Sequence, residues 1–143
     1  MRRHAAAVLL LLCLTACGGG LSKSELVAKG DAICKRINTR MAKQPDPKSA
    51  KDLQRLANKT VALSDPAIDD MEELEPPSEL EADFDKFVAS LKRQRDLTRK
   101  IGEAAGEGDT AELQKVGADA QKAQKEYRRL SGRIGFKECG GGV

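Results

Sequence analysis

Residues 74–91, with the sequence LEPPSELEADFDKFVASL, decide the fold that this chain predicts. The Pro76-Pro77 pair ends one amphipathic segment, because the residue before a proline disfavours the helical conformation. Ser78 followed three residues later by Glu81 is the pattern of a capping box, which predicts that a new helix begins there. Apolar side chains then recur at helical spacing at Leu80, Phe84, Phe87, Val88 and Leu91. The stretch therefore predicts two helices joined by a short connection, which favours antiparallel packing.

The segment before this stretch predicts one long helix or two stacked ones. Asp46 followed by Pro47 is the pattern of an N-cap with proline at the first helical position. The apolar stripe that follows stays in register as far as Leu74 and passes through Pro66. We therefore expect a helix kinked at Pro66, or two pieces of which the second is capped by Asp65.

Two further helices complete the pattern. Ser22 and Glu25 form another capping box near the start of the chain. The small, glycine-rich segment 102–108 predicts a loose turn, after which Asp109 caps the last helix and Ser131-Gly132 ends it. No segment shows the alternation of a strand. The sequence thus predicts an all-α fold, an antiparallel four-helix bundle.

The first sixteen residues have the organisation of a bacterial secretion signal. Arg2 and Arg3 precede an apolar run of about ten residues, half of what a membrane-spanning helix needs. The run ends in Leu14-Thr15-Ala16-Cys17, which is similar to the lipobox of bacterial lipoproteins. Cys17 is therefore expected to become the lipid anchor, because two or three acyl chains such as palmitate hold a protein stably on a membrane. The alternative is an ordinary secretory signal.

These features divide the chain into three parts. Residues 1–16 are the expected signal peptide, residues 17–21 the lipidated cysteine with a glycine-rich tether, and residues 22–143 the helical bundle domain. The expected location is the cell membrane, lipid-anchored on its extracytoplasmic face. All acidic side chains lie beyond Cys17, so loss of Arg2 and Arg3 lowers the net charge from +3 to about +1. This balance argues against nucleic acid as a partner.

Two cysteines, Cys34 and Cys139, remain after processing, and an exported compartment permits them to form a disulfide. In the expected bundle the last helix ends beside the start of the first. Cys34 would lie about 18 Å along the first helix, and the chain from Gly132 to Cys139 can span about 23 Å. The tail can therefore reach back, and we expect a structural disulfide between the C-terminal tail and the first helix rather than a redox pair, since CxxC spacing is absent.

The residues that several kinds of catalytic and cofactor chemistry require are absent from the sequence after Cys17. The only histidine is His4, within the signal, which excludes a nucleophile activated by histidine and leaves only two cysteines for a zinc site built from histidine and cysteine. Haem, phosphate-loop and dinucleotide motifs are absent as well. We expect no catalytic residues, no metal and no cofactor. An acidic cluster over residues 69–83 and a basic cluster over residues 125–137 are expected to face each other or solvent, with anionic headgroups as the alternative for the basic one.

Four short segments form a recognisable set: Gly30-Asp31-Ala32-Ile33-Cys34-Lys35-Arg36-Ile37-Asn38, Leu74-Glu75-Pro76-Pro77, Gly108-Asp109 and Ile134-Gly135-Phe136-Lys137-Glu138-Cys139-Gly140. Together they resemble a loose group of small actinobacterial lipoproteins and secreted proteins. The group shows an A-x-x-I-C start, a Leu-x-Pro-Pro turn and a terminal glycine and cysteine motif. The resemblance implies a helical fold and a bridge between Cys34 and Cys139, and it transfers no activity.

Three functions remain open at this stage. The first is a non-enzymatic, membrane-tethered protein whose helical faces or charged ends contact an envelope protein or the cell wall. The second is a carrier of a small apolar ligand, because the alanine- and glycine-rich stripes could leave a cavity between the helices. The third, an enzyme that uses only carboxylates such as a glycosidase, is disfavoured because only four aromatic side chains are present to stack on sugars.

Overall fold

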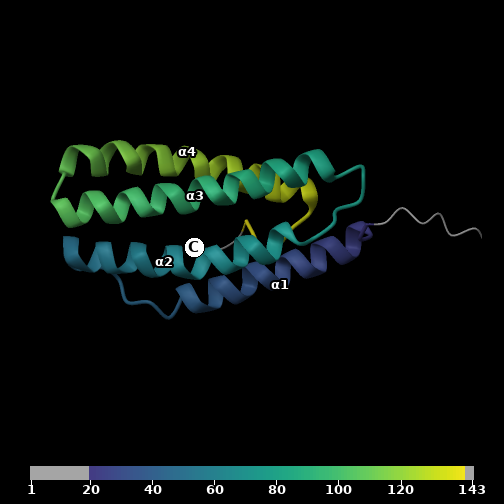
Figure 1. Ribbon diagram of the computed structural model, residues 1–143, viewed down its shortest axis with the longest axis horizontal. Coiled ribbons are helices and arrows are strands. Elements are labelled where there is room, and N and C mark those ends of the chain that lie inside the picture. The colour runs from purple at the N-terminus through teal and green to yellow at the C-terminus, as the bar shows by residue number, and fades with distance from the viewer. Residues whose placement is uncertain (1–19, 141–143) are drawn as a thin grey trace, which may run out of the picture.

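The computed structural model describes residues 20–140, which form four antiparallel helices packed along one axis (Figure 1). Their bounds are α1, Lys23–Met41; α2, Ala50–Glu72; α3, Glu81–Glu107; and α4, Thr110–Ile134. Every regular element within this range is a helix. The prediction of an all-α, antiparallel four-helix bundle is therefore confirmed.

Two of the predicted helix starts are correct. The Ser22 hydroxyl accepts the Glu25 N–H at 3.3 Å, and the Glu25 carboxylate accepts the Ser22 N–H at 2.9 Å, which completes the capping box. Hydrogen bonds from the Ser22 side chain and backbone hold the pKa of Glu25 below its usual value. At the start of α4, Asp109 accepts the Glu112 N–H at 2.9 Å.

The other two starts were wrong. Helix α2 begins at Ala50 rather than after Asp46, and its N-cap is Ser49, whose hydroxyl accepts the Asp52 N–H at 3.1 Å. Helix α3 begins at Glu81 with Leu80 as its N-cap residue, so Ser78 caps nothing. The Leu80 N–H is used in a turn with the Pro77 carbonyl at 2.9 Å, and the Leu80 side chain is buried in the core.

The glycine-rich segment and the end of α4 also differ from expectation. Residues 102–107 continue α3 instead of forming a turn, and the helix ends only at Gly108, which has a φ of 71°. Helix α4 passes through Ser131-Gly132 to Ile134 and ends at Gly135, with a φ of 102°. Pro66 lies inside α2, which remains a single helix, so the alternative of two pieces capped by Asp65 is wrong.

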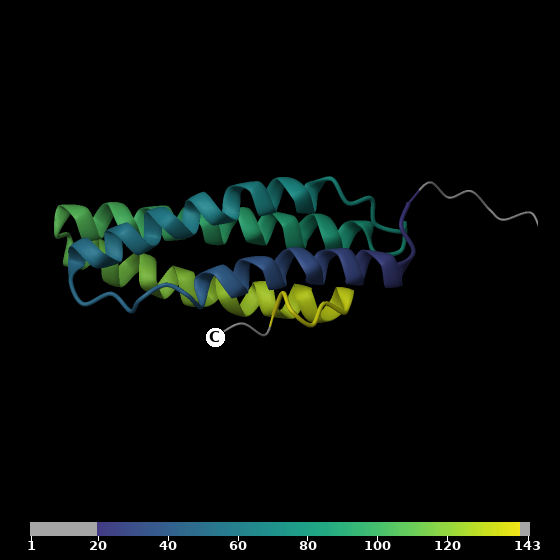
Figure 2. The same cartoon turned by 90° about the horizontal axis from the view of Figure 1, so that it is seen from below.

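The core lies mainly in the half of the bundle where α1 runs beside the other three helices. Helix α1 is the shortest, with 19 residues against 27 in α3, and Figure 2 shows that it accompanies only part of the bundle. The side chains of Leu26, Met71, Phe87, Leu130 and Ile134 are almost fully buried in this half. In the other half the interior is built from small side chains, and a Cβ on Gly102 would lie 2.9 Å from that of Ala57. That close approach of α2 and α3 explains why segment 102–107 is helical.

Glycine at position 30 permits α1 to pack against the C-terminal tail. A Cβ on Gly30 would lie 2.4 Å from the ring of Phe136, whereas one on Gly117 in α4 would meet nothing within 4 Å. Gly30→Ala is therefore expected to lower the free energy of unfolding by about 1–3 kcal/mol through overpacking. Gly117→Ala, the matched control, is expected to raise it by up to about 1 kcal/mol through helix propensity. Urea denaturation of both variants measures the sign of each change in the free energy of unfolding. Equal changes in the two variants would contradict the packing argument.

Candidate ligand-binding cavity

The predicted disulfide between Cys34 and Cys139 is present, with 5.0 Å between the two Cα atoms. Both cysteines are buried, at 5% and 2% exposure, so the bridge lies inside the domain. It joins the middle of α1 to the C-terminal tail, which runs beside α1 in Figure 2. Cys17, the predicted lipid anchor, and the signal segment 1–16 lie outside the described residues.

Three further contacts hold the tail on α1. The Asp31 carboxylate accepts the N–H groups of both Lys137 and Glu138 at 2.9 Å, and the Asn38 side-chain amide donates to the Glu138 carbonyl at 2.9 Å. Phe136 covers Gly30 as described above. We call residues 30–38 with residues 136–139 the tail clamp. The first and last segments on which the resemblance depends therefore meet in space, and their shared role is structural.

A cavity of about 200 Å³, partly open to the surface, lies between the four helices, beside the disulfide. It forms where the C-terminal part of α1 and the end of the tail cover α2, α3 and α4. The apolar part of its wall includes Ile33, Ile37, Ala67, Ile68, Met71 and Leu91. The polar part includes Asn38, Thr60, Ser64, Gln94, Arg95, Thr98, Gln124 and Tyr127. The wall is thus mixed in polarity, whereas the sequence had suggested a cavity for an apolar ligand.

Gln94 is the polar group that stands out in this wall. Its amide nitrogen is buried and has no hydrogen-bond partner among residues 20–140. The hydroxyls nearby are used differently: Thr60, Ser64 and Thr98 each donate to a carbonyl one turn earlier in their own helices, at 2.8–2.9 Å. A buried donor without an acceptor costs about 1–3 kcal/mol, so the Gln94 amide is available to a water molecule or a ligand in the cavity.

Arg95 is the only ionised side chain in the wall, and its charge is compensated. Its guanidinium donates to Asp65 on α2 at 2.8 Å and to the adjacent Asp96 at 2.8 Å. The hydrogen bond to Asp65 is the main reason why the pKa of Arg95 is raised. The cavity therefore carries a fixed ion pair at its edge and no uncompensated charge.

Tyr127 closes the cavity from α4. Burial raises the pKa of its phenol, and the nearby negative charge of Asp31 raises it further. The phenol is therefore protonated at any physiological pH. Its ring stacks on Phe87 with 5.4 Å between centroids, and its oxygen lies 3.9 Å from the Cys34 sulfur. Tyr127 thus connects the cavity to both the aromatic core and the disulfide.

The sequence did contain a signal for this cavity. Gln94 and Thr98 continue the apolar face of α3 that runs through Phe87 and Leu91, at spacings of three and four residues. Gln124 likewise shares the inner face of α4 with the buried Ala123. Polar residues at core-facing positions of neighbouring helices indicate a polar interior site.

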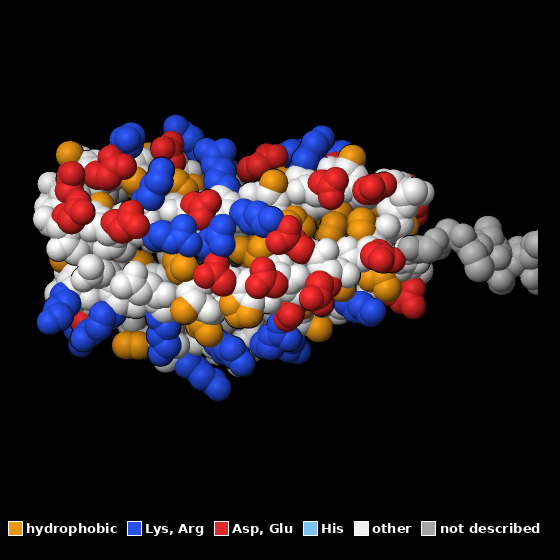
Figure 3. Space-filling view, viewed as in Figure 1, with side chains coloured by type: hydrophobic (Ala, Val, Ile, Leu, Met, Phe, Trp, Pro, Cys, Tyr) orange, Lys and Arg blue, Asp and Glu red, His pale blue; other side chains and the backbone are white. Residues whose placement is uncertain are grey.

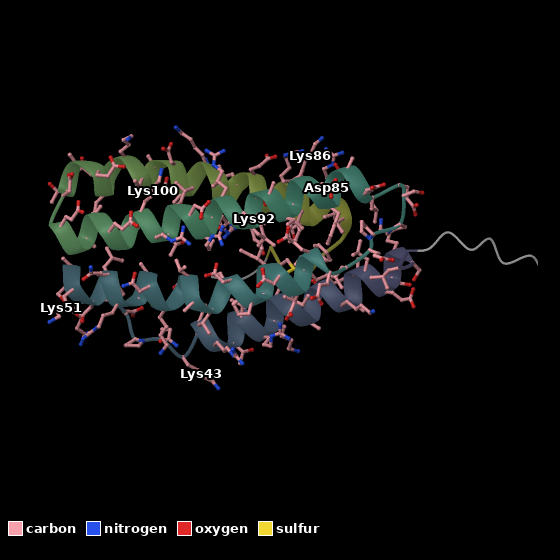
Figure 4. The ribbon with its side chains drawn as sticks, in the orientation of Figure 1. Lys43, Lys51, Asp85, Lys86, Lys92 and Lys100 are labelled. Carbon is pink, nitrogen blue, oxygen red and sulfur yellow. A yellow bond between two sulfur atoms is a disulfide. The ribbon has the colours of Figure 1, made fainter. Side chains whose placement is uncertain are left out.

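The charged surface is mixed in sign (Figure 3). Arg133 of the basic cluster donates to Asp83 of the acidic cluster at 2.9 Å, so the two clusters do compensate each other at this point. Arg36 pairs with Asp70 and Lys92 with Glu72, which links α2 to α1 and to α3. The lysines labelled in Figure 4 are spread along the molecule rather than gathered in one patch. Exposed pairs of this kind stabilise a fold only slightly.

Within residues 20–140, no helix is both long and apolar enough to cross a membrane, and no three acidic, histidine or cysteine side chains gather as metal ligands. Comparisons of the chain with protein-family models, with curated proteins and with solved structures find no match.

Proposed function

We propose that this chain is a bacterial lipoprotein: a non-enzymatic interaction domain held on the extracytoplasmic face of the cell membrane through acylated Cys17. The observation that carries the proposal is the disulfide between Cys34 and Cys139, buried and built into the tail clamp. Disulfides of this structural kind persist in oxidising compartments outside the cytoplasm. They are therefore what an exported domain needs, and the lipobox provides the matching export and anchoring signal.

The arrangement at the start of the domain also fits a tethered protein. Leu21 packs against the core, and its N–H donates to the Glu75 carbonyl at 2.8 Å. The chain therefore enters the bundle at one end of its long axis, where α1 begins (Figure 2). A lipid on Cys17 would leave the sides and the far end of the bundle free to meet an envelope protein. Similarity to actinobacterial lipoproteins remains part of this proposal.

The proposal predicts that Cys17→Ala abolishes acylation. In a bacterial host labelled with radioactive palmitate, the variant is expected to carry no label and to migrate as the longer, untrimmed precursor, because the thiol that receives the lipid is absent. Cys13→Ala is the matched control: it changes a cysteine of the apolar run and is expected to behave as the unaltered protein. A Cys17→Ala protein that is labelled, trimmed and membrane-bound would overturn the proposal.

One observation favours a second candidate function, that of a small-ligand carrier. The cavity of about 200 Å³ is lined by all four helices and contains a buried donor without an acceptor. A small molecule bound between the helices would fill the one and pair the other.

A further inference from the structure

We infer that the cavity binds a small uncharged molecule, of the size of a single ring or a short branched chain, whose one hydrogen-bond acceptor receives an N–H of Gln94. The inference rests on the carrier function proposed above, and it adds the class of ligand and the residue that selects it. Three properties of the cavity support it: its volume, its charge and its unpaired donor.

The volume sets the size of the ligand. An apolar cavity of about 150 Å³ in a helical protein holds benzene. The cavity here measures about 200 Å³, which leaves room for a ring of that size and one polar substituent. Ile33, Ile68 and Met71 form an apolar surface against which such a ring would pack. Burial of the ring would supply most of the binding free energy, at about 25 cal/mol per Å² of apolar surface.

The charge distribution excludes an ionised ligand. Arg95 is already paired with Asp65 and Asp96, and no other ionised side chain lines the wall. A carboxylate or an ammonium group placed in the cavity would lose part of its hydration without gaining a counter-ion. An uncharged ligand meets no such penalty.

The unpaired amide of Gln94 determines which polar group the ligand carries. The hydroxyls of Thr60, Ser64 and Thr98 already donate to backbone carbonyls, so they compete little for a ligand acceptor. Gln94 alone offers a buried N–H with no acceptor in the described chain. A carbonyl or hydroxyl oxygen beside it would form the missing hydrogen bond, and a purely apolar ligand would leave it unmet.

A pair of probes of equal size tests the inference: cyclohexanone, which has one acceptor, and toluene, which has none. Each is titrated into the full protein, in phospholipid nanodiscs or, where it carries no lipid, in buffer. The methyl groups of isoleucine and methionine are followed by NMR. Saturable shifts are expected at Ile33, Ile68 and Met71, which line the cavity, and not at Ile134, which is buried elsewhere. Affinities in the millimolar range are expected for ligands of this size.

Two variants, each with a control, test which side chains contribute to binding. Gln94→Leu removes the donor and puts a shorter, apolar side chain in its place, and it is expected to weaken cyclohexanone binding about three- to tenfold while toluene binding is unchanged or stronger. Gln121→Leu, on the exposed face of α4, is the control. Ser64→Leu fills the cavity and is expected to weaken both probes more than about tenfold, with the exposed Ala62→Leu as its control.

The outcomes separate the two proposals. If neither probe gives a saturable shift at the cavity methyl groups, the cavity holds only water, and both the carrier function and the present inference are wrong. If both probes bind equally and Gln94→Leu changes neither, the carrier function stands and the role of Gln94 is wrong. Tighter binding of cyclohexanone that is lost in Gln94→Leu supports both.

Discussion

Reduction of the disulfide between Cys34 and Cys139 is expected to lower the free energy of unfolding by up to about 4–5 kcal/mol. The two cysteines are 105 residues apart in sequence, so the bridge closes most of the described chain into one loop and removes many conformations from the unfolded state. Domains of this size are commonly stable by only about 5–15 kcal/mol. The reduced protein is therefore expected to be close to the limit of stability.

The comparison uses one sequence in two redox states, with and without a thiol reductant, followed by guanidinium denaturation and circular dichroism. Oxidised and reduced protein then differ in no side chain other than the bridge itself. A second readout locates the effect: without the bridge, the tail is held only by its noncovalent contacts to Asp31, Asn38 and Gly30, so hydrogen exchange of the Lys137 and Glu138 N–H groups is expected to accelerate before that of α3. A difference below about 1 kcal/mol would show that the tail clamp holds without its covalent bond.

The sequence predicted those features of the fold that depend on one local pattern. The capping pairs at Ser22 and Asp109 were correct, because each side chain needs only a backbone N–H three residues away. The starts of α2 and α3 were wrong, because neighbouring groups competed for the same role and the outcome depended on packing. Ser49 rather than Asp46 caps α2, and Leu80, whose side chain is buried, precedes α3 in place of Ser78.

The glycine-rich segment also shows that a local pattern does not predict what depends on packing. Segment 102–108 carries the composition of a turn, yet Gly102 lies within α3 because its missing side chain allows α2 to approach. Composition alone cannot distinguish a glycine that breaks a helix from one that lets two helices meet. The disulfide was predictable, because only two cysteines remained and the topology brought them within reach. The cavity was not, because it depends on where α1 and the tail leave space over the other three helices.

All four aromatic side chains of the chain gather in one cluster that joins the core to the tail clamp. Phe87 lies at its centre and is fully buried, with ring centroids 5.0 Å from Phe136, 5.4 Å from Tyr127 and 6.3 Å from Phe84. Each neighbour belongs to a different part of the structure: the tail, the cavity wall on α4, and the start of α3. The stability of all three parts therefore depends on the ring of Phe87.

Phe87→Ala is accordingly expected to lower the free energy of unfolding by about 3–5 kcal/mol, because it removes a buried ring and leaves a cavity among rigid neighbours. Phe87→Leu, which keeps an apolar side chain in place, is expected to lower it by less than half as much. Urea denaturation followed by circular dichroism measures both. A double-mutant cycle with Phe136→Ala is expected to give a coupling of about 0.5–1.5 kcal/mol, since the two rings contact each other directly. If the effects of Phe87→Ala and Phe136→Ala are strictly additive, the tail is held by the disulfide and Asp31 without help from the aromatic cluster. If Phe87→Ala lowers the free energy of unfolding by less than about 1.5 kcal/mol, the site collapses around the smaller side chain.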